Sequence, residues 1–275
     1  MSYIQSQTDY KTGVEYLLEL KTVQSSAFRI LVEALKEILT DANFEFDESG
    51  MKLIAMDASH TVLVHLKLDS KNFEHYHCPN KIVVGVNMIN LFKLIKTMSN
   101  SDTLTLYVQS DNPNHMGIRI ENGDKNTITT YSLNLMDLNE ESIQIPPATF
   151  SSVITMPSVD FQKICRDMHN LADIIEVKSV GSQLIFSCKG DFAKQETIMG
   201  ECTTNGMSYV KKQDDSEIVQ GLFALKHLVL FTKCTNLCNS IEMYLKNDYP
   251  LIICYSVASL GKIKLCLAPN VSENN

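Results

Sequence analysis

The sequence lacks several features that would assign a class of protein at once. No run of eighteen or more apolar residues occurs in its 275 residues, so we expect no membrane-spanning helix. Its polar beginning, MSYIQSQTDYKTG, has no apolar segment of the kind found in secretory signals. None of the eight cysteines forms a C-x-x-C pair, and most lie in apolar runs such as LIFSC, which favours free buried thiols over disulfides or a zinc site. We therefore expect a protein of the cytosol or nucleus without a metal centre.

The common catalytic motifs are also missing. There is no P-loop, H-E-x-x-H or G-x-S-x-G sequence. Asp57, Ser59 and His60 are residue types of a catalytic triad, but triad members normally converge from separated positions in the chain. The HYHC run at 75–78 offers possible metal ligands, yet no second ligand cluster accompanies it. We expect a protein that is not an enzyme and needs no cofactor, with catalysis by Asp57, Ser59 and His60 as an alternative.

Length and periodicity predict two domains rich in strands. A chain of 275 residues exceeds what one compact core usually takes. Apolar residues at helical spacing predict four amphipathic helices, the third with Ser158 as its N-cap, at about 25–40, 88–98, 158–171 and 224–235. Strands are predicted at 52–56, 62–68, 81–86, 103–108, 127–135, 174–179, 183–188, 218–223, 240–245, 251–256 and 262–268. Each half therefore has two helices among its strands.

The two halves repeat one another. FEFDESGMKLI (44–54) matches IEVKSVGSQLI (175–185) in its apolar alternation, its central glycine and its final Leu-Ile. VNMINLFKLIKTMSNSDTLTLYV (86–108) matches FALKHLVLFTKCTNLCNSIEMYL (223–245). The offsets are similar, about 131 and 137 positions, and a period this long indicates a duplicated domain, because solenoid repeats run about 20–50 residues.

A linker separates the halves. The acidic start and double proline of DLNEESIQIPPAT (137–149) predict an extended segment. Its apolar residues are Ile143 and Ile145. They either pin the linker to the nearest core or line a groove for a partner.

Positive charge gathers on the predicted helices. The net charge of −8 argues against nucleic-acid binding only if the charge is spread evenly. The helices carry eight bases against four acids, so they are +4 while the rest of the chain is −12. Solvated lysines are ordinary on one surface helix, but here each helix carries a pair of bases on one face. The candidate DNA-binding residues are Arg29, Lys36, Lys93, Lys96, Lys163, Arg166, Lys226 and Lys233. Such contacts touch phosphates and position a protein without reading sequence.

Several segments match, in the correct order, the motifs of one known family. MDASHTVLV (56–64) resembles that family's M-D-S-S-H-x-x-L-V segment, and LMDLNEESIQIP (135–146) resembles its interdomain connecting loop. ICRDM (164–168), FTKCT (231–235) and LAP (267–269) also fit. With these segments the chain resembles the proliferating cell nuclear antigen family of DNA sliding clamps, and the likeness runs from about Leu18 to the end of the sequence.

The resemblance implies an α+β fold of two similar clamp domains, each with two helices packed on antiparallel sheet. Three copies would form a six-domain ring with the helices lining the hole, where the eight bases match inward-facing positions of the family. Segments 126–135 and 193–202 would pair as edge strands between copies. The expected divisions are an N-terminal extension, domain 1, the connecting loop, domain 2 and a C-terminal tail, at 1–16, 17–136, 137–149, 150–270 and 271–275.

The resemblance also implies a DNA polymerase processivity factor that docks replication and repair proteins. Partner peptides of the form Q-x-x-[ILM]-x-x-[FY]-[FY], known as PIP boxes, would bring DNA polymerase, clamp loader, flap endonuclease and ligase to the connecting loop. The matching pocket positions are Met56, His60, Ile143, Ile145, Pro146, Pro250, Leu267, Ala268 and Pro269. Thr61 and Cys266 replace bulkier groups near that pocket. The compartment would be the nucleus, or the site of viral DNA replication if the source is a large DNA virus.

Two non-catalytic alternatives remain. A monomeric processivity factor would grip DNA by charge alone, but the acidic balance of the chain counts against it, because an open monomer needs a stronger basic surface. A protein-interaction scaffold without a DNA role would leave the bases on all four helices unexplained.

Overall fold

The structure is a computed structural model that describes residues 15–139, 143–202, 204–212 and 216–270. Most of the expected N-terminal extension (1–14) and the expected C-terminal tail (271–275) lie outside the described residues, as do residues 140–142 of the connecting loop. No helix within the described ranges is long and apolar enough to cross a membrane.

Four α-helices form where the apolar periodicity predicts them, and each ends earlier than predicted. They are α1 (Ser25–Ile38), α2 (Met88–Ile95), α3 (Ser158–His169) and α4 (Leu225–Phe231). After α1, Leu39 takes an extended conformation with φ −117° and leads into the next strand. After α4 the chain tightens into the 3₁₀ helix η2 (Thr232–Leu237), where the Thr232 hydroxyl donates to the Val229 carbonyl at 2.7 Å. A second 3₁₀ turn is η1 (Ser70–Asn72).

The predicted N-cap of the third helix is wrong. Ser158 is the first helical residue, and its buried hydroxyl donates to the Cys238 carbonyl at 2.7 Å. Pro157 holds the cap position and makes no side-chain cap hydrogen bond. The hydroxyl of Ser158 therefore ties α3 to the segment that follows η2.

The described residues contain eighteen strands in three sheets. In the first half they are β1 (Tyr16–Thr22), β2 (Asp41–Asp47), β3 (Gly50–Met56), β4 (Val62–Asp69), β5 (His75–His77), β6 (Ile82–Asn87), β7 (Asp102–Gln109), β8 (Asn112–Asn122) and β9 (Thr127–Asn134). In the second half they are β10 (Ser152–Pro157), β11 (Ile174–Val180), β12 (Gln183–Lys189), β13 (Lys194–Gly200), β14 (Ser208–Lys212), β15 (Val219–Ala224), β16 (Ser240–Leu245), β17 (Leu251–Val257) and β18 (Gly261–Leu267).

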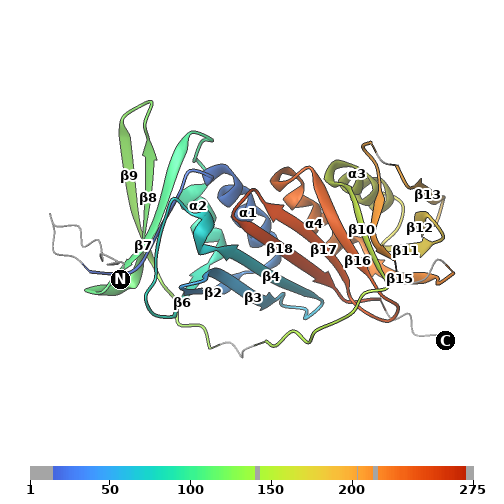
Figure 1. Cartoon of the computed structure of the whole chain (residues 1–275), viewed down its shortest axis with the longest axis horizontal. Helices are drawn as coiled ribbons and strands as arrows, with labels where there is room; N and C mark the ends of the chain where they lie inside the picture. The colour runs from blue at the N-terminus through green and yellow to red at the C-terminus, as the bar shows by residue number, and fades with distance from the viewer. Residues whose placement is uncertain (1–14, 140–142, 203, 213–215, 271–275) are drawn as a thin grey trace, which may run out of the picture.

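One sheet crosses the boundary between the halves. The five-stranded sheet has the order β5-β1-β7-β8-β9, the four-stranded sheet β13-β12-β11-β15, and the nine-stranded sheet β14-β10-β16-β17-β18-β4-β3-β2-β6. The nine strands are continuous because β18 pairs antiparallel with β4, as the centre of Figure 1 shows. Each half therefore contributes one set of five strands and one set of four, which confirms the predicted duplication of an α+β domain.

Two equivalent hairpins carry the sequence repeat. Gly50 turns the chain between β2 and β3, and Gly181 turns it between β11 and β12. Both have positive φ, +137° and +53°. A Cβ on Gly50 would lie 2.0 Å from the carbonyl oxygen of Leu68, so a side chain is excluded there. The two glycines hold different positions in their hairpins, because Gly50 pairs with Asp47 as the first residue of β3, whereas Gly181 lies in the turn between the paired residues Val180 and Gln183.

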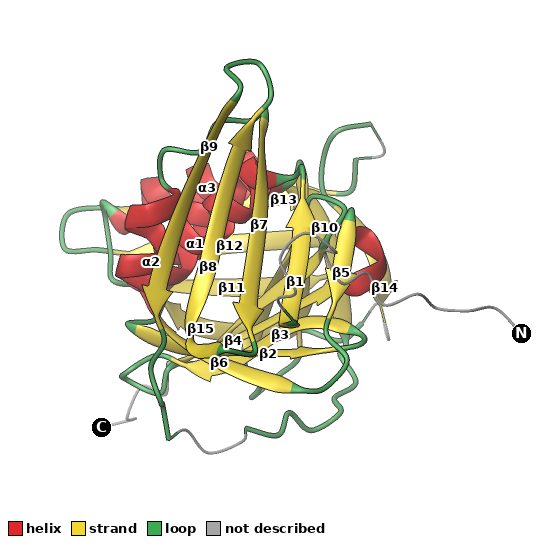
Figure 2. Ribbon diagram, turned by 90° about the vertical axis from the view of Figure 1, so that its left-hand side faces the viewer, coloured by secondary structure: helices red, strands yellow, loops and turns green. Residues whose placement is uncertain are grey.

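The helices of the two halves form one layer. α1 contacts α2, α4 and η2, and α3 contacts α4 and η2. Figure 2 shows α1, α2 and α3 gathered on one side of the strands. Their apolar sides are buried, with Phe28, Leu31, Phe161 and Leu228 at most 1% exposed. The polar sides of the layer are left facing solvent.

Candidate functional site

Six of the eight candidate DNA-binding bases are exposed on the helical layer. They are Lys93, Lys96, Lys163, Arg166, Lys226 and Lys233. Lys93 lies in the last turn of α2 and Lys96 is its C-cap residue, where a positive charge also suits the helix dipole. Among the described residues none of the six forms an ion pair, so their charges are available to a ligand.

Arg29 and Lys36 are less accessible. The Lys36 ammonium contacts the Glu37 carboxylate and lies 5.0 Å from the centre of the Phe92 ring, and its side chain is 19% exposed. The Nε atom of Arg29 is buried and has no hydrogen-bond partner in the described structure. Both bases of α1 therefore present less free charge than those of the other helices.

The connecting loop is anchored at both ends. The Met136 amide donates to the Gly85 carbonyl at 2.8 Å, and the Asn43 side chain donates to the Leu138 carbonyl at 2.9 Å. A Cβ on Gly85 would lie 2.2 Å from the Met136 carbonyl oxygen, so glycine permits this close approach. At the other end the Ser151 amide donates to the Leu245 carbonyl at 3.1 Å. In Figure 1 the described parts of the loop, on either side of residues 140–142, lie along the lower edge of the molecule between β9 and β10.

An apolar row crosses the face of the nine-stranded sheet that points away from the helices. Its members lie opposite one another on successive strands: Met56, Leu63, Cys266, Ile252 and Tyr244. Side chains opposite one another in an antiparallel sheet share a face. We use the name loop groove for the candidate partner-binding surface that combines this row with Ile143, Ile145 and Pro146, the connecting-loop residues that the family resemblance implies.

An aromatic cluster lies at the Tyr244 end of the apolar row. The Phe150 ring centre lies 5.3 Å from that of Tyr244 and 5.6 Å from that of Tyr249, both nearly edge-on. Leu63, Ile252, Tyr244 and Phe150 were not among the pocket residues predicted from the sequence. Only the strand register identifies the first three, but the aromatic Phe150 directly after the loop was a signal in the sequence.

The pocket positions taken from the resemblance differ in accessibility. Met56 is 38% and Ile145 40% exposed, whereas Leu267 is fully buried, so its side chain belongs to the core. His60, Ala268 and Pro269 line a separate pocket of about 560 Å³ together with Lys226 and His227. Pro250 and Ile143 are half-buried, and Pro146 is exposed. The structure thus brings one of the helix bases to the edge of the partner-binding candidates.

Asp57 has a structural role in the turn between β3 and β4. Its carboxylate accepts from the amides of Thr61 at 2.8 Å and Val62 at 2.7 Å, and from the Ser59 hydroxyl. Burial acts to raise the pKa of the Asp57 carboxyl, but these hydrogen bonds outweigh it and hold the pKa below its usual value. His60 is exposed with φ +53°. Asp57 therefore caps a tight turn.

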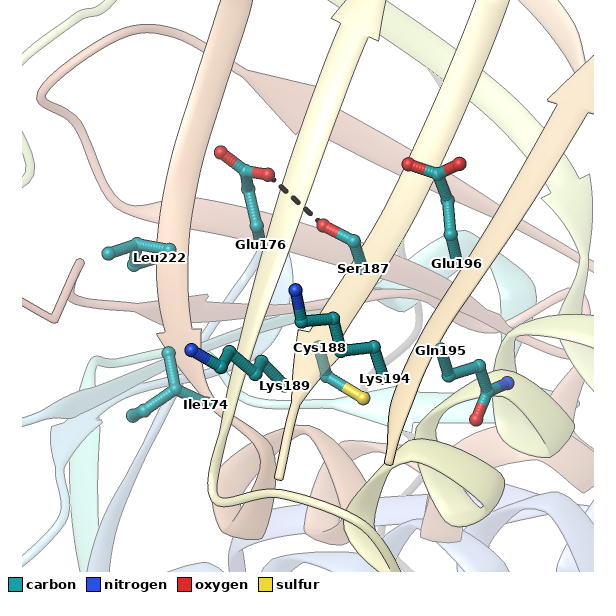
Figure 3. Close-up of a pocket in the computed structure, with 9 residues that line it drawn as sticks. All are labelled: Ile174, Glu176, Ser187, Cys188, Lys189, Lys194, Gln195, Glu196 and Leu222. Carbon is teal, nitrogen blue, oxygen red and sulfur yellow. Dashed lines mark hydrogen bonds between the residues drawn. The ribbon is translucent and has the colours of Figure 1, made fainter. Parts of the chain in front are cut away.

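A pocket of about 640 Å³ lies on the outer face of the four-stranded sheet. Figure 3 shows Glu176, Ser187 and Glu196 side by side on three strands, next to Lys189 and Lys194. The Ser187 hydroxyl donates to the Glu176 carboxylate at 3.0 Å, and no histidine lines this pocket.

The metal hypothesis for the HYHC run has no support from the geometry. Within the described ranges no group of three or more His, Cys, Asp or Glu side chains could hold a metal ion. The His75 ring instead lies 3.2 Å from the Glu19 carboxylate.

Comparison with known proteins identifies the family. The model of the N-terminal domain of proliferating cell nuclear antigen matches residues 17–143, and the model of its C-terminal domain matches residues 144–270. The chain belongs to the proliferating cell nuclear antigen family. It is also 35% identical over 260 residues to a probable DNA polymerase sliding clamp of Paramecium bursaria Chlorella virus 1, with 93% of this chain and 98% of the relative covered. The family resemblance in the sequence is therefore confirmed.

Proposed function

We propose that the chain is a DNA sliding clamp: three copies close into a ring of six domains around duplex DNA and hold DNA polymerase on it. The observation that carries this proposal is the junction inside the chain. Strand β18 ends the five-strand set of the second half and pairs with β4, which ends the four-strand set of the first half. The equivalent strands β9 and β13 are left as free edges. Pairing β9 of one copy with β13 of the next repeats the internal junction and closes a ring if the rotation permits.

The duplication also gives the register of that contact. Strands β2 and β3 correspond residue for residue to β11 and β12, because Asp41 pairs with Asn87 directly before α2 as Ile174 pairs with Ala224 directly before α4. Met56, opposite Leu63, then corresponds to Lys189, opposite Lys194, so Leu63 of β4 corresponds to Lys194 of β13. Cys266 of β18 corresponds to Ser132 of β9, counted from the equivalent residues Tyr107 and Tyr244. Within the chain, Leu63 lies opposite Cys266. Ser132 is therefore expected opposite Lys194 of the neighbouring copy.

Cysteine cross-linking tests this register. With Cys202, the exposed native cysteine, changed to serine, the pair Ser132→Cys and Lys194→Cys is expected to form disulfides between copies on mild oxidation, because opposed residues have Cβ atoms roughly 5 Å apart. The matched control pairs Ser132→Cys with Glu196→Cys, two residues out of register. Denaturing gels should show cross-linked species only for the first pair. Equal cross-linking of both pairs, or of neither, would contradict the proposed junction.

In this ring the helical layer faces the DNA. The exposed lysines and arginines contact phosphates without reading sequence, so the clamp slides. The acidic remainder of the chain keeps the outer surface from binding DNA. Processivity is topological rather than electrostatic, which separates this function from that of a charge-tethered monomer. A separate loader opens the ring, and the clamp itself catalyses no reaction. It acts where DNA is replicated, in the nucleus or at a site of viral DNA replication.

The loop groove is the docking site for partner peptides of the Q-x-x-[ILM]-x-x-[FY]-[FY] type. Its aliphatic, methionine and aromatic side chains suit an aliphatic–aromatic plug, and methionine adapts to different shapes. DNA polymerase, clamp loader, flap endonuclease and ligase are the proposed partners.

Truncation of the loop residues tests the groove. Ile143→Ala with Ile145→Ala is expected to weaken a fluorescent peptide of this type about 10-fold or more, because two apolar contacts are lost. Gln144→Ala, which changes the exposed residue between them, should leave the affinity unchanged. Fluorescence anisotropy measures both. If the unmodified chain, the double isoleucine variant and Gln144→Ala bound the peptide with equal affinity, the peptide would not bind at the loop groove.

A further inference from the structure

A cluster of basic side chains lies on the outer face of the nine-stranded sheet. His65 and Lys67 of β4 stand directly opposite Lys264 and Lys262 of β18. These four line a pocket of about 450 Å³. We call them the basic shelf. Like charges directly opposite one another destabilise a sheet, so this arrangement does not stabilise the fold.

Only part of this charge is neutralised within the chain. Lys67 pairs with Asp69 at 3.4 Å, and Lys262 pairs with Glu242 at 3.1 Å. Lys264 forms no ion pair in the described structure, and its ammonium lies 5.6 Å from the centre of the Tyr244 ring. Burial lowers the pKa of the His65 imidazole, and the charges of Lys264 and Lys67 lower it further, which indicates a positive local field. Lys264 is thus a half-buried cation without a direct ion pair in the described structure, and the Glu242 carboxylate is the acidic group that its charge reaches.

The basic shelf adjoins the loop groove. Lys264 is two residues from Cys266 on β18, and His65 is two residues from Leu63 on β4. Residues two apart on a strand share a face and are roughly 7 Å apart. One extended peptide segment can therefore occupy the groove and reach Lys264.

We propose that the basic shelf, centred on Lys264, binds acidic side chains of the partner segment whose apolar residues fill the loop groove. This inference rests on the proposed function of the groove and adds a preference for aspartate or glutamate beside the apolar plug. Peptide carboxylates fit better than DNA phosphates here for two reasons. The shelf lies on the opposite side of the sheet from the helical layer, and Asp69 and Glu242 beside it would repel a chain of phosphates while leaving room for one or two carboxylates.

Labelled peptides with the same apolar motif and different flanks test the proposal. One peptide carries neutral flanks, and two carry a pair of glutamates either before or after the motif. Binding is measured by anisotropy to the unmodified chain, to Lys264→Ala, to Lys264→Glu and to Lys189→Glu. The last is a matched control, because Lys189 is an exposed lysine on the outer face of a different sheet.

One acidic peptide is expected to bind the unmodified chain about 5-fold more tightly than the neutral peptide at low salt. Lys264→Glu should abolish or reverse that advantage, Lys264→Ala should reduce it, and Lys189→Glu should preserve it. High salt should diminish the advantage without abolishing binding of the neutral peptide. Equal affinity of the unmodified chain for acidic and neutral peptides would contradict the proposed role of the basic shelf, while the proposed role of the loop groove would stand. Failure of every peptide to bind would overturn the groove itself. Loss of duplex DNA affinity in Lys264→Glu, with peptide binding unchanged, would assign the shelf to phosphates and contradict the proposal.

Discussion

Replacing Tyr131 with aspartate is expected to convert the ring into single chains, so that the native mass falls from three times 30.9 kDa to about 30.9 kDa. Tyr131 precedes Ser132 on the free edge strand β9 and packs against the core on the side of the helices. In the duplicated fold it corresponds to Leu265 of β18, which is fully buried at the internal junction. An unpaired carboxylate there would cost about 3 kcal/mol or more per contact, which is roughly 100-fold in affinity. Light scattering after size-exclusion chromatography at micromolar concentration measures the change.

Thr130→Asp is the matched control for the junction. Thr130 lies on the same strand but its side chain points to the opposite, exposed face. This variant should keep the native mass of the unmodified chain, and circular dichroism should show that both variants are folded. A Tyr131→Asp protein that keeps the native mass of the ring would rule out β9 as the contact between copies.

Reversing the charge of Lys93 and Lys96 is expected to reduce loader-dependent stimulation of DNA polymerase at least about 10-fold while leaving the native mass unchanged. Each lysine-to-glutamate change alters the charge by −2, so the double variant takes the helices from +4 to 0. Because the ring contains three copies, the positive charge around the hole would fall by three times the change in one chain. Each phosphate contact that is lost also lowers the slope of log affinity against log salt by about 0.9. Polymerase synthesis on a primed circular template, measured over a range of salt concentrations, tests both effects.

Lys178→Glu with Lys189→Glu makes the same charge change on the outer face of the four-stranded sheet. Because this face points away from the helices, stimulation should remain close to that of the unmodified chain. If the inner and outer variants lost stimulation equally, the effect would follow total charge, and the helical layer would not be the DNA surface.

Most of the fold could be predicted from the repeated patterns in the sequence. Both hairpins contain a glycine with positive φ, Gly50 and Gly181, although strand pairing shows that the two glycines differ by two positions. The apolar periodicity located all four helices. Helix ends were less predictable. Ser158 resembles a cap by residue type, but its hydroxyl is used by the Cys238 carbonyl from a distant segment.

Strands with few apolar residues were missed. Strand β8, with the sequence NPNHMGIRIEN, begins with polar residues and was not predicted, although it lies in the middle of the five-stranded sheet between β7 and β9. Its pairing partners, rather than its own composition, make it a strand. Likewise β14 pairs only along one side, with β10.

The candidate site was predictable only where the signal was local. Six helix bases could be inferred from charge and spacing, but the partial burial of Arg29 and Lys36 depends on packing that charge does not reveal. The apolar row of the loop groove combines five strands, three of them from the second half and two from the first. Leu63 and Tyr244 lie in one row because β18 pairs with β4 and so joins the two halves. The sequence of neither strand alone predicts that pairing.

Whether the protein encircles DNA as a closed ring can be tested by measuring its topological linkage to circular DNA. The variant with Ser132→Cys and Lys194→Cys is mixed with circular duplex DNA under reducing conditions with a clamp loader, sealed by oxidation, and washed in high salt. Sealed rings are expected to stay on circular DNA in high salt and to be released when the DNA is linearised. High salt screens the contacts between the basic side chains and the phosphates, and only a closed ring stays on DNA without those contacts. Loss of the protein from circular DNA in high salt, despite complete cross-linking, would contradict the ring and favour a factor held on DNA by charge.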